Sequence, residues 1–596
     1  MHKNNELAGS KDATSLLGIG LGIASAMPFF AGSIPALVVG GITSLFSGIA
    51  LSSDLIKKKE DKINVKEKEK FIIPSDEVYK DEGVLIGYTT DTNDPVIVPY
   101  DFYMRHFALV GGSGVGKTTL GLWILYQIMV KGGGFIFIDA KIDADTRDAL
   151  GYIAKALGRE DELYVLNVDD PEHSNTYNPL LDGDPDEVAS RLLNLLPSAE
   201  DNPGADFYRQ SVNHALTVII GALKAAKVRY TFSDITIMMQ SPEALERILR
   251  MVPKGSGERM QLEVFLDKYR KREKGGTTID VNKLKDALGG MAGRAATFAQ
   301  GKFGQIFNHY APEINLTDII MNNKMLYVML PTMGKDAAAL NLGKMLLSDL
   351  RTAVYKVQGV PPAERPWPPF TVFADEMGSY VMPGMARLFE QARSAQVALM
   401  PGFQAFGNLA TVGDDFKDIV LQNTWTKAMY RSGSFASAEE SSEIVGKVIK
   451  YQYSYSETKN KGESSQGIKI NPQFSETDAG GSGVSYREVE EARVSPEKFS
   501  SLGVGAAIIT IGARVYHIKV PRITTPINDE KPGEKRNPDL IFKPMRHPTW
   551  IPKDESALSF GDIYEEFLMG AGSTDEADIK QSAEKKIQKQ ENQKEN

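Results

Sequence analysis

Short, mostly apolar runs alternate along the chain with longer segments of helical periodicity. Such runs predict buried strands, because both faces of a strand inside a sheet meet apolar neighbours. They lie at residues 83–88, 95–99, 107–110, 134–139, 163–168, 325–330, 370–374, 397–400, 425–431, 506–511 and 515–520. Strands that alternate with helices are typical of a parallel sheet covered on both faces, with ligands at the carboxyl ends of the strands. The predicted fold class is therefore α/β.

The pattern changes between residues 183 and 307, where leucine and alanine recur at helical spacing and strand-like runs are few. We interpret this segment as an inserted all-α domain that divides a nucleotide-binding domain into residues 56–182 and 308–525. Its basic cluster Lys268–Arg272 suits either contact with a phosphate backbone or a solvated helix face. Later, residues 456–485 are rich in Ser, Gly, Lys and Gln and predict a mobile loop or a long hairpin.

The two ends of the chain differ sharply in composition. Residues 526–596 are polar and predict a disordered tail, whose final Lys/Glu/Gln run is either disordered or a single exposed helix; such tails often serve partners. The stretch from Ala13 to Ser53 contains no charged residue. It is too long for one membrane helix of about 20 residues and suits two, near 14–30 and 34–52.

Residues 1–55 are thus predicted to be a membrane anchor, with Pro28 and Pro35 marking its turn. The cluster Lys57–Lys59 places the following domain in the cytoplasm by the positive-inside rule. Two alternatives stay open. In the first, Ala24–Ala26 is a signal-peptidase site, as its sequence resembles one, but secretion would separate the nucleotide site from ATP. In the second, the many small residues pack in a buried helical hairpin of a soluble domain.

The segment Phe107–Thr119 combines an apolar strand, a glycine-rich loop and the start of a helix. It contains a full match to G-x-x-x-x-G-K-[ST], in which backbone N–H groups surround phosphate, the lysine reaches the β- and γ-phosphates and the hydroxyl contacts Mg²⁺. The helix that follows turns its positive N-terminus towards the same phosphates. The predicted nucleotide-binding residues are Gly111, Gly112, Ser113, Gly114, Val115, Gly116, Lys117, Thr118 and Thr119. ATP, or GTP, with Mg²⁺ is the predicted ligand.

The strand at 370–374 ends in Asp375 and Glu376, which fit the second half of such a site. The first acid of this Walker B pattern supports Mg²⁺ together with Thr118, and the second polarises the attacking water. Arg393 follows on a helical segment, and Gln404 follows the next strand. A glutamine there can sense the γ-phosphate and an arginine can reach a neighbouring subunit's phosphate, although either residue also suits a plain surface position.

Composition and net charge exclude some classes of protein and of chemical site. The 596 residues suit several domains, and the formal net charge of −9 argues against a generally basic nucleic-acid coat protein, without excluding a basic channel inside an oligomer. The chain contains no cysteine, so disulfides, thiolate metal sites and cysteine nucleophiles are excluded.

Together these residues resemble the type IV coupling proteins, the TraD/TraG-type ATPases of conjugation and type IV secretion. The resemblance covers about residues 14–525. Besides the Walker motifs it rests on the hydrophobic hairpin, Arg105–His106, Asp139–Lys141, Tyr177–Leu180, the helical insertion, Gln391–Phe406 and Gln422–Asn423. Two departures are a very short segment between the membrane helices and Ile142 where the family's Asp-x-Lys-Gly has glycine.

The resemblance implies a RecA-like motor domain, an all-α domain and a hexameric ring at the bacterial inner membrane, with the motor in the cytoplasm. It implies single-stranded DNA bound to a relaxase, or protein effectors and adaptors, as cargo, and secretion-channel components as partners. It also implies that Lys117 and Thr118 hold phosphate and Mg²⁺, Asp375 supports the metal and Glu376 is the catalytic base. Gln404 would be the sensor and Arg393 the finger acting in trans.

Two other functions compete with a DNA-pumping coupling ATPase. An FtsK-type DNA translocase would normally carry more membrane helices and a C-terminal winged-helix reader. A nucleotide-gated membrane receptor that recruits protein substrates, and hydrolyses ATP only to change state, fits the helical domain and polar tail equally well.

Overall fold

The computed structural model describes residues 83–197, 203–273, 276–333, 336–462, 477–529, 535–552 and 558–563. The predicted membrane anchor lies outside these residues, so the two membrane helices stay a prediction. Among the helices that are described, none has the length and apolar character needed to cross a bilayer. All the described residues belong to one compact unit.

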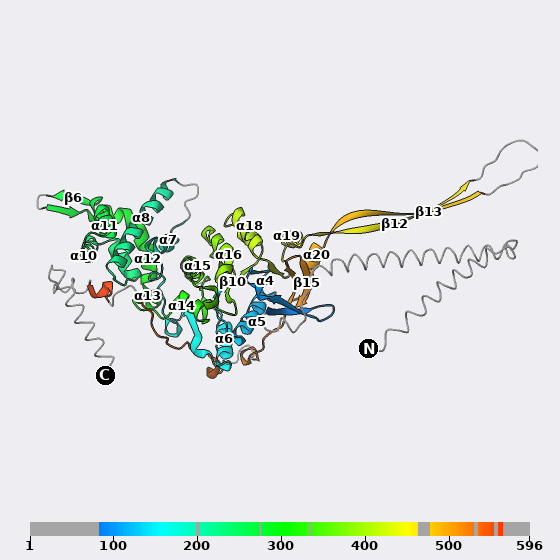
Figure 1. The fold of residues 1–596 in the computed structure, drawn as a ribbon, viewed down its shortest axis with the longest axis horizontal. Coiled ribbons are helices and arrows are strands. Elements are labelled where there is room, and N and C mark those ends of the chain that lie inside the picture. The colour runs from blue at the N-terminus through cyan, green and yellow to red at the C-terminus, as the bar shows by residue number, and fades with distance from the viewer. Residues whose placement is uncertain are drawn as a thin grey trace, which may run out of the picture. The chain divides into compact units, whose positions relative to one another are not determined.

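The unit is built on one large sheet, to which the strands labelled β10 and β15 in Figure 1 belong. Its strands run in the order β2-β1-β15-β14-β11-β3-β10-β9-β4-β8-β5. The strands are β1 Gly83–Thr89, β2 Pro95–Pro99, β3 Phe107–Val110, β4 Phe135–Asp139, β5 Leu163–Asn167, β8 Met325–Met329, β9 Phe370–Ala374, β10 Val397–Phe403, β11 Thr426–Met429, β14 Ala506–Ile511 and β15 Arg514–Lys519. From β11 to β5 neighbouring strands are parallel, and from β11 to β2 they are antiparallel. The predicted α/β class with a parallel sheet is confirmed.

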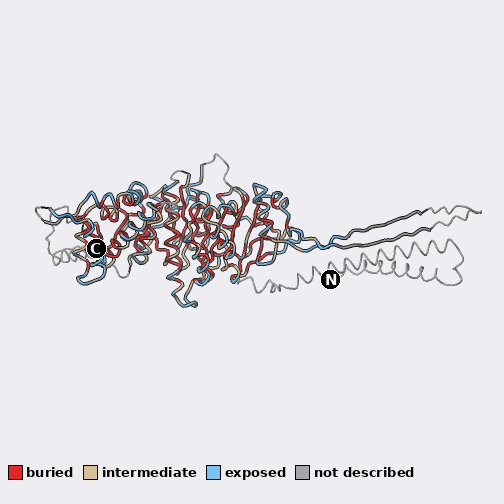
Figure 2. The backbone as a smooth tube through the Cα atoms, turned by 90° about the horizontal axis from the view of Figure 1, so that it is seen from above, coloured by how far each residue is buried: buried red, intermediate tan, exposed pale blue. Residues whose placement is uncertain are grey.

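Helices cover both faces of the sheet, and each face has its own core. In β4, Phe135 and Phe137 belong to one cluster and Ile136 and Ile138 to the other, because successive strand side chains point to opposite faces. Helices α5 (Lys117–Val130) and α6 (Ala144–Ala156) pack on the first face, and α15 (Asp336–Gln358) packs on the second. Figure 2 shows buried residues throughout the interior of the unit.

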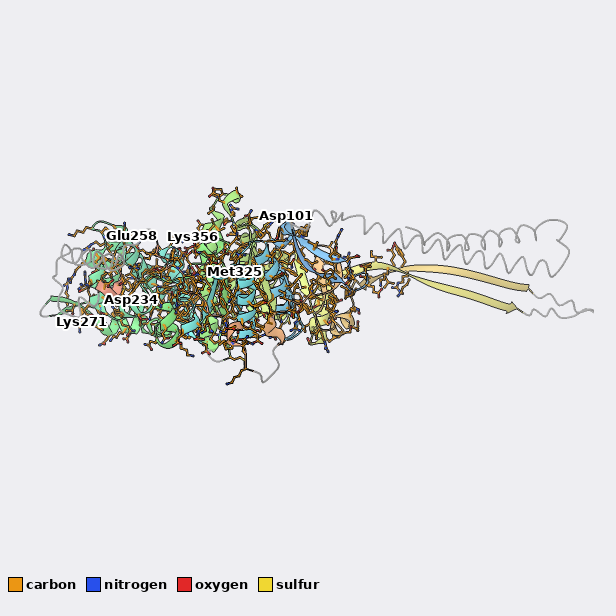
Figure 3. The ribbon with its side chains drawn as sticks, turned by 90° about the horizontal axis from the view of Figure 1, so that it is seen from below. Asp101, Asp234, Glu258, Lys271, Met325 and Lys356 are labelled. Atoms are coloured by element: carbon orange, nitrogen blue, oxygen red, sulfur yellow. The ribbon has the colours of Figure 1, made fainter. Side chains whose placement is uncertain are left out.

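The segment between β5 and β8 is mostly helical. Its helices are α7 Pro185–Leu193, α8 Pro203–Ala225, α9 Phe232–Met238, α10 Pro242–Met251, α11 Gly257–Asp267, α12 Val281–Ala299, α13 Gly301–Phe307 and α14 Leu316–Met321. One difference from the all-helical expectation is a short hairpin of β6 (Arg270–Glu273) and β7 (Gly276–Ile279). The basic cluster Lys268–Arg272 therefore lies on β6 and at the end of α11 that precedes it, with Lys271 at the margin of the helical segment (Figure 3).

A long antiparallel pair, β12 (Lys447–Gly462) and β13 (Thr477–Ala492), occupies the segment for which a mobile loop or long hairpin is predicted. Pairing begins at Lys447 and Ala492, so the ribbon extends beyond the predicted range of 456–485 on both sides. Residues 463–476 between the two strands lie outside the described part.

The C-terminal segment corrects the prediction of a disordered tail from residue 526. Residues 535–552 and 558–563, here called the C-terminal strap, pack on the rest of the unit. Arg536 pairs with Asp145 and Asp148 of α6, and the Phe542 ring fills the space above Gly151. Further along, the backbone N–H of His547 donates to the buried carboxylate of Glu313 at 2.7 Å, and its ring stacks on Tyr164.

The strap ends in the helical segment. Ser559 forms a bridge with Arg229, and Phe560 and Ile563 are buried in the core there. A few widely spaced anchors hold an otherwise polar chain, and composition averaged over the segment conceals them. The rest of the predicted tail, residues 564–596, lies outside the described residues.

We expect Phe560→Ala to lower the free energy of unfolding by about 3–5 kcal/mol, because it empties a fully buried aromatic position. Ile541→Ala on the same strap is the matched control, since Ile541 is exposed and should change stability by only about 0.5 kcal/mol. Denaturant unfolding of the purified chain measures both. Equal midpoints for the two variants would show that the strap does not contribute to the core.

Candidate nucleotide site

The predicted phosphate loop connects the buried strand β3 to α5, whose first residue is Lys117. The Lys117 side chain is 5% exposed, and its Nζ donates to the carbonyl oxygens of Gly111 at 2.7 Å and Gly112 at 3.1 Å. The lysine therefore folds back over its own loop, within reach of any phosphate that the loop surrounds.

The two predicted halves of the site meet directly. The Thr118 hydroxyl donates to Asp375 Oδ2 at 3.0 Å, and Lys117 Nζ lies 3.7 Å from Glu376 Oε1. This contact requires α5 to lie close to β9. Gly121 makes the approach possible, because a Cβ there would be 2.3 Å from the Phe373 ring.

The Asp375–Glu376 pair has an unusual backbone. Glu376 has a φ of 50°, in the left-handed region that non-glycine residues rarely adopt. Its N–H donates to Asp375 Oδ1 at 3.0 Å, and the buried Tyr380 hydroxyl donates to the Asp375 carbonyl at 2.9 Å. Strain of this kind persists only where surrounding contacts hold it, and here it occurs at the residue whose carboxylate lies beside Lys117.

Gln404 follows β10, and β10 lies between β3 and β9 in the sheet. The phosphate loop, Gln404 and the two acids therefore follow three neighbouring parallel strands at the same edge. The Gln404 side chain is exposed, which suits contact with a ligand rather than a core role. Gly402 lets β10 pass the acids, because a Cβ there would be 2.8 Å from Asp375 Oδ1.

Arg393 lies apart from this group. It is exposed on the short 3-10 helix η6 (Ala392–Ala395), which follows α16 (Ala386–Gln391). Within the described residues, no hydrogen bond or ion pair joins the Arg393 side chain to the phosphate loop or to the acids. The structure of one chain thus brings Lys117, Thr118, Asp375, Glu376 and Gln404 to one edge and leaves Arg393 outside it.

Asp139 is a further carboxylate at this edge. Its Oδ2 accepts from the Tyr327 hydroxyl at 3.0 Å, and its Oδ1 accepts from Lys141 N at 3.0 Å. Burial, with the nearby Asp375 charge, raises the pKa of Asp139 to about 7. The Asp139–Lys141 motif therefore places a carboxyl group that can carry a proton near neutral pH beside the acids, although its role was not assigned from the sequence.

His106 is a structural residue of the site that the sequence also left without a role. Its Nδ1 accepts from Leu399 N of β10 at 3.1 Å, and its Nε2 lies 2.9 Å from the Phe389 carbonyl of α16. Burial lowers the pKa of His106 to about 4, so the ring is neutral and donates from Nε2. Its neighbour Arg105 stacks over Trp425, with 4.1 Å from the guanidinium to the ring centre. The only sequence signal was the Arg105–His106 pair ahead of the loop.

Comparisons with known proteins agree with the resemblance. A family model described as the TraM recognition site of TraD and TraG matches residues 369–497. The type 4 coupling protein DotL of Legionella pneumophila is 23% identical over 355 residues, covering 52% of this chain and 45% of DotL. The match thus spans about half the length of that curated relative. These two matches confirm the resemblance to type IV coupling proteins.

Solved structures with a similar arrangement include two of the conjugative coupling protein TrwB. The unbound form has a TM-score of 0.47 at 13% identity, covering 74% of this chain and 91% of that one. The complex with ADP and Mg²⁺ has a TM-score of 0.46 at 14% identity, covering 76% and 94%. VirB4 of Thermoanaerobacter pseudethanolicus has a TM-score of 0.45 at 12% identity, covering 75% and 98%.

We expect Gly402→Ala to lower ATP turnover by about 100-fold, because the new methyl group displaces the Asp375 carboxylate by a fraction of an ångström or more. Gly407→Ala is the control, since a Cβ at Gly407 meets no atom within 4 Å. Steady-state turnover of both variants tests the close approach. Wild-type turnover in Gly402→Ala would mean that the site tolerates the shift.

We expect His106 to make the fold sensitive to acid. Its pKa is 6.5 when unfolded and about 4 when folded, so the unfolded chain binds more protons between these values. The contribution of His106 to the free energy of unfolding is fully present above about pH 6.5. It is lost as the pH falls towards 4, which lowers that free energy by up to roughly 3 kcal/mol. Denaturant unfolding at several pH values should show this slope, and His106→Asn, which keeps an acceptor, should flatten it. An unchanged slope in the variant would assign the acid sensitivity to other groups.

Proposed function

We propose that this chain, which resembles the type IV coupling proteins, is a membrane-anchored ATPase that brings relaxase-bound DNA, protein effectors or both to a type IV secretion channel. ATP hydrolysis drives the transfer. The observation that carries this proposal is the direct contact between Lys117 and Thr118 on one side and Asp375 and Glu376 on the other. Burying charged side chains such as Lys117 and Asp375 lowers the stability of the fold, and binding a nucleotide would explain why they are there.

The Thr118 hydroxyl and the Asp375 carboxylate suit Mg²⁺, because both are oxygen ligands and they lie 3.0 Å apart at the phosphate loop. Thr118 would hold the ion with phosphate oxygens, and Asp375 would support it directly or through water. When bound, Mg²⁺ supplies neutralisation of phosphate charge. Lys117, which bonds to the loop carbonyls in this structure, would bond to the β- and γ-phosphates of a bound nucleotide.

Glu376 is assigned as the base that orients the attacking water and accepts its proton. Its present neighbour is Lys117 Nζ, which would leave it for phosphate. Gln404, exposed between the loop and the acids, is assigned as the sensor of the γ-phosphate. These roles follow from position and from the chemistry of each group.

Arg393 is assigned to the site of a neighbouring copy. It is exposed and lies apart from the phosphate loop of its own chain, as a finger acting in trans requires. A closed ring, proposed here to be a hexamer, supplies such a neighbour for every site. The proposed location is the bacterial inner membrane with the motor in the cytoplasm, from the uncharged stretch 13–53 and Lys57–Lys59.

A second candidate function is a receptor that recruits proteins and uses ATP only to change state. The net charge of −9 favours it, because an acidic chain gains little from general contact with phosphate backbones. Under either function, the match to a TraM recognition model supports a partner protein that contacts residues 369–497.

We expect the full-length chain to hydrolyse ATP faster with single-stranded DNA, and this stimulation to weaken as salt rises. Lys117→Ala, Glu376→Gln and Arg393→Ala should each lower turnover at least about 100-fold, by loss of phosphate binding, of the base and of the finger. Measurements use detergent-solubilised protein at concentrations where assembly is verified by light scattering.

Mixing inactive variants separates a shared site from a self-contained one. Lys117→Ala subunits retain Arg393, and Arg393→Ala subunits retain Lys117, so a mixed ring contains some intact shared sites. Partial recovery of turnover supports the assignment in trans, and no recovery contradicts it. Robust turnover that DNA does not change would favour the protein-recruiting receptor.

A further inference from the structure

Arg393 is held on a turn that is fixed from behind. Its neighbours Ala392 and Ala395 are fully buried, whereas Arg393 and Ser394 face solvent. On its buried side, His106 donates to the carbonyl of Phe389, one turn earlier in α16. The base of the turn therefore has one position, and Arg393 points outward from it.

Ser394 joins this turn to the end of α15. Gln358 Nε2 donates to Ser394 Oγ at 2.6 Å, and Ser394 Oγ donates to the Gln391 carbonyl at 2.6 Å. Arg365 donates from NH1 to the Ser394 carbonyl. Both the side chain and the backbone of the residue beside Arg393 are thus held by residues of another element.

Arg365 is itself fixed in place. Its Nε donates to the Val360 carbonyl at 2.8 Å, and its NH2 donates to the Gln358 carbonyl at 2.9 Å. Because a guanidinium is planar and presents its donors as a rigid fork, three carbonyls from two segments fix its orientation. Arg365 therefore closes the carboxyl end of α15 and binds the Arg393 turn at the same time.

A pocket of about 340 Å³ lies beside this contact. It is lined from α15 by Arg351, Tyr355 and Gln358 and from α16 by Arg387, Leu388 and Gln391. The hydrogen bonds of Ser394 to Gln358 and to the Gln391 carbonyl therefore lie at the edge of this pocket and connect the two elements there.

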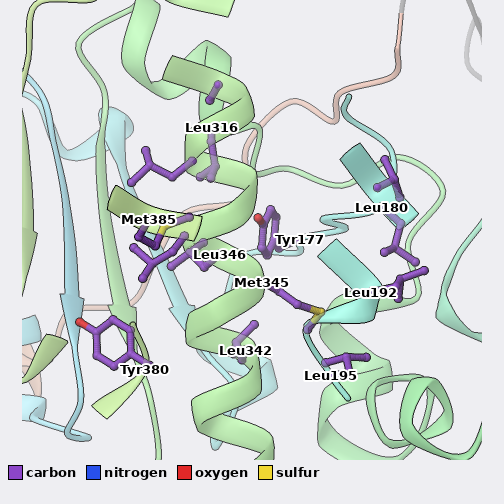
Figure 4. Close-up of a cluster of buried hydrophobic side chains, with 14 of the residues drawn as sticks. Tyr177, Leu180, Leu192, Leu195, Leu316, Leu342, Met345, Leu346, Tyr380 and Met385 are labelled. Carbon is purple, nitrogen blue, oxygen red and sulfur yellow. The ribbon is translucent and has the colours of Figure 1, made fainter. Parts of the chain in front are cut away.

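At its other side, α15 is joined to the helical segment. Arg191 of α7 pairs with Asp349 at 3.0 Å, both side chains being buried, and Tyr177 donates to the same carboxylate at 2.5 Å. Figure 4 shows Leu342, Met345 and Leu346 of α15 between the region of Leu192 and Leu195 and that of Tyr380 and Met385. A single helix thus contacts the helical segment, the Walker B side of the sheet and the Arg393 turn.

We propose that Gln358 and Arg365 are positioning residues that hold the Arg393 turn in the orientation from which Arg393 reaches the nucleotide of a neighbouring copy. This inference rests on the proposed trans role of Arg393. Their side chains donate hydrogen bonds to Ser394 and to the carbonyls of Gln358 and Val360, so the two residues would act through Ser394 and Arg393. Fixing the turn in advance lowers the cost of ordering the arginine at each round of hydrolysis.

The test measures ATP turnover of the assembled full-length chain carrying Arg365→Ala or Gln358→Ala. We expect kcat to fall about 10- to 100-fold for Arg365→Ala and less for Gln358→Ala, with KM within about twofold of wild type, because the nucleotide's own subunit is unchanged. Arg387→Ala is the matched control. It removes an arginine from the same surface without touching Ser394, and should leave kcat unchanged.

Combining Arg365→Ala with Arg393→Ala separates positioning from a general structural role. A residue that acts only through Arg393 adds no further loss once Arg393 is gone, so the double variant should match Arg393→Ala alone. Arg365→Lys keeps the charge without the fork and should not restore kcat. If Arg365→Ala fails to fold, Gln358→Ala carries the test, since it removes one exposed hydrogen bond.

An unchanged kcat in Arg365→Ala and Gln358→Ala, while Arg393→Ala is inactive, would overturn the inference and leave the proposed function standing. Additive losses in the double variant would overturn it as well. If Arg393→Ala is as active as wild type while Lys117→Ala is inactive, the trans finger itself fails, and the positioning role fails with it.

Discussion

The site depends on one packing contact, the approach of α5 to β9 across Gly121 and Phe373. Helix α5 carries Lys117 and Thr118, and β9 ends in the two acids, so their separation is set by how closely the helix lies on the sheet. A side chain at Gly121 would hold the helix away by at least a methyl group's width. The hydrogen bond between Thr118 and Asp375 exists because that position is empty of side-chain atoms.

A second constraint is strand order. With β10 between β3 and β9, the residues after β10 lie between the phosphate loop and the acids. The same strand connects backwards through η6 to Arg393 and α16, and His106 ties its Leu399 to α16. One strand therefore places Gln404 beside the phosphate loop at one end and leads back to the outward-facing Arg393 turn at the other.

Local signals in the sequence were sufficient for the strands and the phosphate loop, because an uncharged run such as Phe107–Val110 has few alternatives to a buried strand. Strand order was not predictable, since it depends on contacts between residues hundreds of positions apart. The hydrogen bonds of Gln358 and Arg365 to Ser394 are equally non-local. The C-terminal strap was missed because Phe542 and Phe560 are isolated anchors in a polar segment, and His106 because a lone histidine carries no periodic signal.

The polar contacts of α15 make sense as constraints on register. A buried ion pair such as Arg191–Asp349 adds little stability over apolar packing, but breaking it costs about 3–5 kcal/mol because a charge is left unpaired. A slip of α15 by one helical turn, about 5.4 Å, would break that pair and would also carry Gln358 away from Ser394. Apolar side chains alone would tolerate intermediate positions far better. Helix α15 therefore fixes the position of the helical segment relative to the Arg393 turn. A displacement of either along the helix would strain the polar contacts of the other.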